Sequence, residues 1–178
     1  MNILNVLFGT VLATAFGSVA LSASSPQSVA NAGEPTTVKV PQRFEFYIRQ
    51  GLPPEYRGKI NPNKEPTVPI VIKGADIYNA RCSSCHGLMG FGNGVAAGQM
   101  RTRPADLAWS LSDPKVKDDF LYWTIADGGA QFGSSMPGYK KDLTEPQIWY
   151  VVTYMRAAFE GREASRSKGT MQASIEGR

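Results

Sequence analysis

The sequence contains only one histidine and two cysteines among its 178 residues, which excludes several kinds of site. A structural zinc site usually takes four ligands from cysteine and histidine, and this chain has no second Cys/His half-site. Basic residues are not concentrated either. Residues 70–160 hold nine lysines and arginines against nine acids, so that stretch lacks the basic face of a typical nucleic-acid-binding protein. We therefore expect no nucleic-acid partner.

Charged side chains are absent from residues 1–32. The stretch from Ile3 to Leu21 is largely apolar, and Ala30-Asn31-Ala32 resembles a cleavage site. This pattern predicts a secretory signal peptide over residues 1–32, although the usual basic residues near its start are missing. An uncleaved membrane anchor is the alternative, because about twenty apolar residues can span a bilayer. In both cases we expect the rest of the chain to be exported.

The two cysteines and the histidine lie together as Cys82-Ser83-Ser84-Cys85-His86. A Cys-x-x-Cys-His sequence is typical of haem c attachment, because each thiol can add to one vinyl group while the adjacent imidazole ligates the iron. A thioredoxin-like dithiol would not need the histidine, and no βαβ pattern surrounds the motif. We therefore predict one covalent haem c held by Cys82 and Cys85, with His86 as an iron ligand. Bacteria attach haem c in the periplasm, which agrees with export to that compartment.

The second axial ligand cannot be a histidine, so a methionine, a lysine, an amine, water or an open position remains. Met136 lies in a glycine-rich loop 50 residues after His86, and Pro137 stiffens the chain beyond it. Met100 is its main competitor, whereas Met155 falls on the apolar face of a predicted helix and is better explained by core packing. We predict Met136. A thioether raises the reduction potential, and two occupied axial positions leave none for oxygen or a substrate.

The pattern of residues 70–160 predicts an all-α domain with three or four short helices and long loops around the haem. One helix is expected over residues 73–81, delivering the motif, and a second over residues 120–126, with Phe120, Leu121, Trp123 and Thr124 on one face. Ser112-Asp113-Pro114 is typical of a further helix start. The last helix follows a capping box at Thr144 and ends near Gly161.

Residues 33–69 contain seven prolines, which disfavour a long helix and favour extended backbone. A pure linker needs no aromatic residues, yet this predicted N-terminal arm contains Phe44, Phe46, Tyr47 and Tyr56 among its arginines. Three alternatives remain open: an arm packed on its own domain, a segment that docks to a membrane-bound redox complex, or a flexible tether. Residues 161–178 form a polar tail whose last four residues match a protease recognition sequence used in recombinant expression.

Residues 70–160 resemble a monohaem class I cytochrome c, in the bacterial branch related to the c-type haem subunit of cbb3-type oxidases. The likeness is carried by these residues: Gly74, Tyr78, the Cys82–Gly87 motif, Gly90, Gly92, Gly94, Pro104-Ala105-Asp106-Leu107, Met136-Pro137 and Tyr154. It implies that Gly74, Tyr78 and Tyr154 lie where the first and last helices cross, with Tyr78 near the cofactor. It also implies that the Pro104 carbonyl orients His86 by accepting its hydrogen bond.

These observations predict an exported electron-transfer protein and not an enzyme. It would act either as a free carrier between a redox donor and acceptor or as the haem subunit of a larger respiratory or dehydrogenase complex. The alternative is a haem enzyme or a gas-binding sensor with an open or displaceable sixth iron site.

Overall fold

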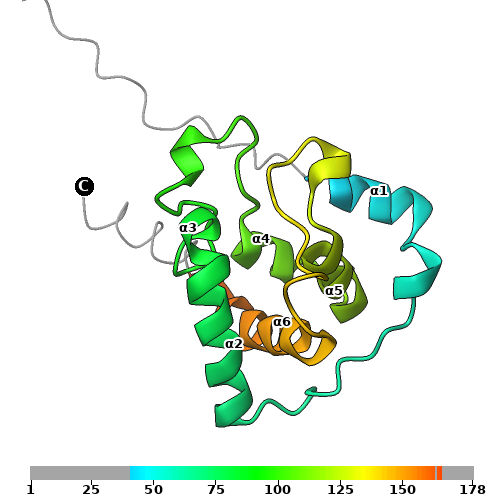
Figure 1. Ribbon diagram of the computed structural model, residues 1–178, viewed down its shortest axis with the longest axis vertical. Coiled ribbons are helices and arrows are strands. Elements are labelled where there is room, and N and C mark those ends of the chain that lie inside the picture. Colours follow the sequence, from blue (N-terminus) through cyan, green and yellow to red (C-terminus); the bar gives the residue numbers. More distant parts are fainter. Residues whose placement is uncertain (1–40, 163, 166–178) are drawn as a thin grey trace, which may run out of the picture. The chain divides into compact units, whose positions relative to one another are not determined.

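The computed structural model describes residues 41–162 and 164–165, and all regular structure in them is helical (Figure 1). These residues belong to one of the two units into which the chain divides, Lys39–Arg178. The predicted signal peptide, residues 33–40 of the arm and residues 166–178 of the tail lie outside the described residues. None of the described helices is both long and apolar enough to cross a membrane. The helices are α1 Gln42–Gln50, η1 Pro54–Tyr56, α2 Val68–Arg81, α3 Ser83–His86, η2 Ala97–Gln99, α4 Leu107–Ser112, α5 Asp118–Asp127, η3 Ala130–Phe132 and α6 Glu145–Phe159.

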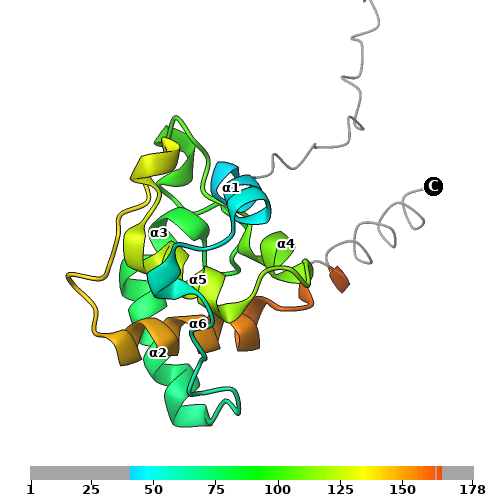
Figure 2. The same cartoon turned by 90° about the vertical axis from the view of Figure 1, so that its right-hand side faces the viewer.

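The expected all-α fold is confirmed, and its centre is the crossing of α2 and α6, which both views show (Figures 1 and 2). The two helices approach closely at Gly74, where a β-carbon would lie 2.1 Å from the Tyr150 carbonyl oxygen and 2.7 Å from Cβ of Tyr154. One turn later, the fully buried Tyr78 ring packs 5.3 Å from that of Tyr154 and 5.2 Å from that of Phe159. The helix crossing that the family resemblance implied for Gly74, Tyr78 and Tyr154 is therefore confirmed, whereas the place of Tyr78 near the cofactor stays a prediction.

Helix α6 begins as its sequence predicts. The side-chain oxygen of Gln147 accepts a hydrogen bond from the Thr144 backbone at 2.8 Å, which satisfies a donor left free at the helix start. Val151, Val152 and Phe159 are at most 1% exposed, so the predicted apolar face of this helix is its buried face.

Two other helix boundaries differ from the prediction. Helix α2 begins at Val68 and not at Lys73, because Pro69 lies in the first turn, where the missing N–H costs nothing. The Ser112-Asp113-Pro114 sequence ends α4 instead of starting a helix, with Asp113 as the C-cap residue.

Six of the ten residues of α5 are buried, more than the single face expected, since the arm covers the side that would otherwise face water.

The prediction of an extended arm is wrong for residues 42–50, which form α1. The seven prolines flank this stretch and none lies between Pro41 and Pro53, so no helical hydrogen bond is lost. Pro41 itself stands at the N-cap, where proline is tolerated.

The described part of the arm packs on its own domain, which favours the first of the three alternatives. Arg43 is 7% exposed and its Nη1 donates a hydrogen bond to the Trp123 carbonyl at 3.3 Å. The Tyr47 ring lies 4.6 Å from that of Phe120, and Tyr56 is 6% exposed. Some of the side chains that would have formed a docking surface are therefore used in packing against the domain.

Candidate haem site

The Cys-x-x-Cys-His motif lies where α2 passes into α3. Cys82 ends α2 by donating its backbone N–H to the Tyr78 carbonyl at 2.8 Å, and it also precedes the single turn of α3. The glycine-rich loop that follows folds back on this turn. Carbonyls of residues 84–86 accept hydrogen bonds from backbone N–H groups of residues 92–96, at 2.8 to 3.1 Å. The free carbonyls at the end of a short helix are thus satisfied, and the motif is held in place.

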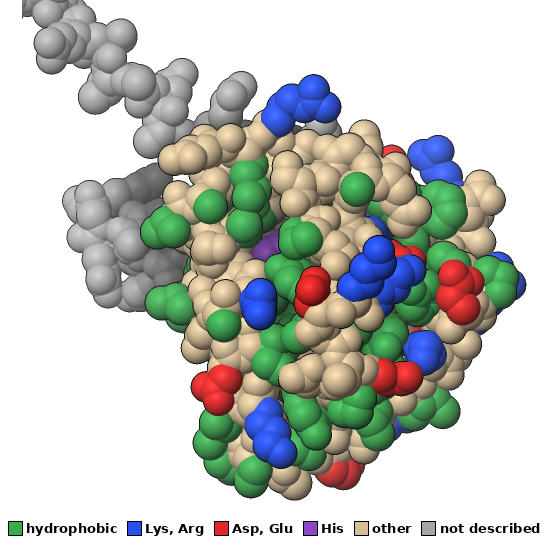
Figure 3. All heavy atoms as spheres, viewed as in Figure 1, with side chains coloured by type: hydrophobic (Ala, Val, Ile, Leu, Met, Phe, Trp, Pro, Cys, Tyr) green, Lys and Arg blue, Asp and Glu red, His purple; other side chains and the backbone are tan. Residues whose placement is uncertain are grey.

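His86 is 8% exposed, and its Nδ1 lies 3.0 Å from the Ala105 carbonyl oxygen. Figure 3 draws the chain's one histidine in purple, and only a small part of it is visible on this face of the molecule. Burial lowers the pKa of His86, and the hydrogen bond to Ala105 only partly opposes this. A neutral imidazole that donates from Nδ1 keeps its Nε2 lone pair for a metal.

The carbonyl that orients His86 belongs to Ala105, so the role that the family resemblance gave to the Pro104 carbonyl is corrected by one residue. The Pro104 carbonyl faces Gly92 instead, where a β-carbon would lie 2.6 Å from it. Asp106 fixes this loop, because its side chain caps α4 by accepting a hydrogen bond from Trp109 N at 2.8 Å.

The two thiols are partly buried and unpaired. Burial, together with the neighbouring Cys85, raises the pKa of Cys82 to about 12, so its thiol stays protonated at neutral pH. Ser84 Oγ lies 3.8 Å from Cys85 Sγ. Among the described residues no group of three or more His, Cys, Asp and Glu side chains could hold a metal ion.

Met136 lies on a loop that runs against the end of α5 and returns to the motif. Its carbonyl accepts a hydrogen bond from Gly129 N at 2.8 Å. A β-carbon on Gly128 would lie 2.6 Å from that same oxygen, so only glycine permits this approach. Three residues later, the Tyr139 hydroxyl donates to the carbonyl of Arg81, the residue before Cys82, at 2.8 Å. The loop therefore begins at α5 and ends beside the attachment motif.

Residues 71–155 match the family model described as cytochrome C oxidase, cbb3-type, subunit III. This region, just under half of the chain, is similar to that cytochrome c family. A chain of the reducing HAO-like protein complex of Kuenenia stuttgartiensis is 23% identical, with a TM-score of 0.46 over 53% of this chain. The match covers 46% of that chain, so it spans less than half of its length. A search of curated proteins found no match.

The donor set of the cytochrome domain fits a haem c. Two unpaired thiols and a buried imidazole with a fixed Nδ1 lie within five consecutive residues, as covalent attachment and axial ligation require. Tyr78, four residues before Cys82, donates a hydrogen bond from its hydroxyl to the Gly87 carbonyl at 2.8 Å. Cys82, Cys85 and His86 would hold the group, and Met136 remains the predicted second ligand.

Met155 and Met100, the other methionines considered as iron ligands, lie in different surroundings. Met155 is 5% exposed and belongs to the hydrophobic core, in agreement with the packing interpretation. Met100 is partly buried and follows η2. Two residues later, Thr102 Oγ1 donates a hydrogen bond to the Gly133 carbonyl at 3.2 Å. This bond joins the loop that carries Ala105 to the loop that carries Met136.

Sequence reasoning missed Ala105, Thr102 and Tyr139. The Ala105 carbonyl, the Thr102 hydroxyl and the Tyr139 hydroxyl each act on a residue between 19 and 58 positions away. The residue types alone do not show which distant residues will form a hydrogen bond with one another. The aromatic character of Tyr139, beside a predicted ligand loop, was the one available hint.

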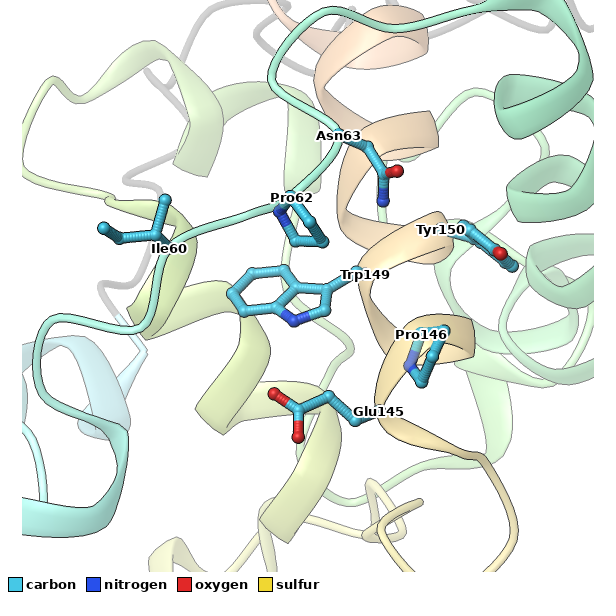
Figure 4. A pocket seen from close by; sticks show the side chains of 7 residues that line it. All are labelled: Ile60, Pro62, Asn63, Glu145, Pro146, Trp149 and Tyr150. Carbon is cyan, nitrogen blue, oxygen red and sulfur yellow. The ribbon is translucent and has the colours of Figure 1, made fainter.

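A separate pocket of about 440 Å³ lies between the arm and the start of α6 (Figure 4). It is lined by Ile60, Pro62, Asn63, Glu145, Pro146, Trp149 and Tyr150. None of these residues belongs to the haem site, so the pocket plays no part in the chemistry described above.

Proposed function

We propose that the chain is an exported c-type cytochrome that transfers single electrons through one haem bound covalently at Cys82 and Cys85, with His86 and Met136 as axial ligands. The observation that carries this proposal is the buried His86 imidazole, whose Nδ1 is held by Ala105 beside two unpaired thiols. An imidazole fixed in this way presents Nε2 in one direction, as an axial ligand must.

When bound, the haem would supply the one-electron chemistry. The chain's own contributions are distinct. Cys82 and Cys85 would tether the group, Ala105 fixes the tautomer and plane of the His86 ring, and His86 and Met136 would ligate the iron. With these two ligands the protein would pass electrons without binding oxygen or a substrate, so we propose no enzymatic activity.

The proposed partners are a redox donor and a redox acceptor in the periplasm, reached either as a free carrier or within a larger respiratory or dehydrogenase complex. Support for the periplasm comes from the apolar residues 1–32 and from the attachment chemistry of haem c. Of the arginine and aromatic side chains first considered for partner docking, Arg43 and Tyr56 are buried, so recognition by residues 41–61 would have to rely on exposed groups such as Phe46 and Arg49.

The test combines attachment with ligation. The purified protein should retain one haem after acid-acetone extraction, because thioether links resist it. Its ferric form should show a sulfur-to-iron charge-transfer band, and its ferrous form should not bind CO. Met136→Ala should abolish the band and open the site to CO, whereas Met100→Ala should leave both unchanged. Rapid CO binding by the wild type would instead favour the enzyme or sensor alternative.

A further inference from the structure

Asp127, the last residue of α5, joins three parts of the fold through one carboxylate. Its Oδ1 accepts a hydrogen bond from the Tyr56 hydroxyl at 2.6 Å and pairs with Lys140 Nζ at 2.8 Å. Its Oδ2 accepts a hydrogen bond from Trp123 Nε1 at 3.1 Å. The donors come from the arm, from the loop after Met136 and from α5 itself.

The backbone around Asp127 is attached to the Met136 loop along its length. Tyr139 N donates to the Ile125 carbonyl at 3.0 Å, and Lys140 N donates to the Ala126 carbonyl at 3.1 Å. A β-carbon on Gly138 would lie 2.8 Å from the carbonyl carbon of Asp127. The Lys140 side chain adds an ion pair to this backbone attachment, so the carboxylate reinforces the point from which the loop returns toward the motif.

The arm also contacts Asp127. Tyr56 is 6% exposed, and its short hydrogen bond is the arm's direct contact with Asp127. Arg43 stacks 4.3 Å from the Trp123 ring and attracts Asp127 electrostatically, although one of its nitrogens, Nη2, has no hydrogen-bond partner. A buried guanidinium beside a carboxylate favours the ionised form of that carboxylate.

We propose that Asp127 is a positioning residue that fastens the Met136 loop to the arm and to α5, and so keeps Met136 at the iron. This inference rests on the proposed function, since it assumes that Met136 is a ligand. Asp127 does not touch the reacting group itself and acts through the loop. The arm would thus contribute to the ligation of the haem.

The rate at which cyanide binds to the ferric protein tests this proposal, because cyanide must wait until Met136 leaves the iron. Asp127→Asn keeps the size of the side chain and removes its charge. We expect it to raise this rate about tenfold, equivalent to about 1.4 kcal/mol, and to weaken the sulfur-to-iron charge-transfer band. Tyr56→Phe removes a single donor and should raise the rate about threefold, in a protein that is less perturbed.

Asp118→Asn is the matched control. Asp118 lies at the other end of the same helix and pairs with Arg156 at 2.8 Å, so this variant also loses an ion pair of α5. It should lower the thermal midpoint and change the cyanide rate less than twofold. Equal cyanide rates in the two Asp→Asn variants, or a rate in Asp127→Asn within twofold of wild type, would overturn the proposal.

Met136→Ala, measured alongside, separates the two levels of inference. If this variant keeps the charge-transfer band, the ligand assignment fails and the positioning role fails with it. If the band disappears in Met136→Ala while both Asp127→Asn and Tyr56→Phe behave as wild type, the ligand assignment stands and only the positioning role is overturned.

Discussion

Asp127 is subject to opposing influences on its charge. Burial of its carboxylate opposes ionisation, but hydrogen bonds from Lys140 and Tyr56 outweigh burial and hold the pKa of Asp127 below its ordinary value. In an unfolded chain this carboxyl would titrate near pH 4. The folded protein therefore keeps Asp127 ionised at pH values where the unfolded chain has already taken up a proton.

This difference predicts a pH-dependent effect of Asp127→Asn on stability. The stabilisation due to the ionised carboxylate is fully present above about pH 5 and is lost as the pH falls through the lowered pKa of Asp127. The gap in unfolding free energy between wild type and Asp127→Asn should thus be largest at pH 7 and shrink toward pH 3. Urea unfolding followed by circular dichroism measures it, and a gap that stays constant or widens in acid would contradict the prediction.

For individual residues, the sequence predicts the Cys-x-x-Cys-His motif but does not predict which carbonyl forms a hydrogen bond with His86. Cys82, Cys85 and His86 lie within five neighbouring residues, so their spacing alone identifies them as candidate haem-binding residues. Which carbonyl meets His86 depends on how a distant loop turns. The Pro104 carbonyl faces Gly92 while the Ala105 carbonyl lies 3.0 Å from the ring nitrogen, an arrangement that only the folded chain shows.

At the scale of the helices, the close packing of α2 against α6 depends on Gly74. Alanine usually stabilises a helix by about 1 kcal/mol relative to glycine. At this crossing a β-carbon would lie only 2.1 Å from the Tyr150 carbonyl oxygen, and the two helices would have to separate.

We therefore expect Gly74→Ala to destabilise the protein by about 1–3 kcal/mol, the usual cost of overpacking a core. Thermal or urea unfolding provides the measurement. Gly98→Ala is the control, because its β-carbon would meet nothing within 4 Å. A Gly74→Ala protein as stable as wild type would show that the crossing is looser than described.

The elements also differ in how far their sequence reveals them. Helix α6 carries a cap, a regular apolar face and a terminal glycine, all local features that agree with one another. Helix α1 ends at a glycine, Gly51, but no side chain caps its start, and it sits in a proline-rich stretch. Its Arg43 is buried only because Trp123 and Phe132 of the domain receive it, at 4.3 and 4.9 Å from the two rings. Such tertiary stabilisation leaves no periodic pattern in the sequence.

For the whole molecule, the packed arm predicts the result of a truncation. Deleting residues 33–63 removes Leu52 and Tyr56 from the core, where each is about 5% exposed, and uncovers Trp123. Burial of one such side chain contributes about 1.5–3 kcal/mol, so the loss should reach several kcal/mol. We expect a lower unfolding midpoint and a weaker charge-transfer band.

Deletion of residues 33–40, which removes none of the described contacts, is the control. If the longer deletion instead left the haem spectrum and the stability unchanged while slowing reduction by a partner, the arm would be a docking segment after all. The sequence alone left these alternatives open because the composition of an arm does not reveal which surface it covers.

The distance along the chain between the arm and its contacts also bears on the order of folding. Tyr56 and Asp127 are separated by 71 residues, Arg43 and Trp123 by 80, and Asn61 and Thr153 by 92. Contacts of such long range form late, because the entropy of closing the intervening loop must be lost first. The part of the domain that leaves the ribosome first is therefore expected to dock last. Cys82 and Cys85 lie between the two partners of each of these pairs, so we expect the proposed haem-attachment segment to be less constrained until the arm has docked.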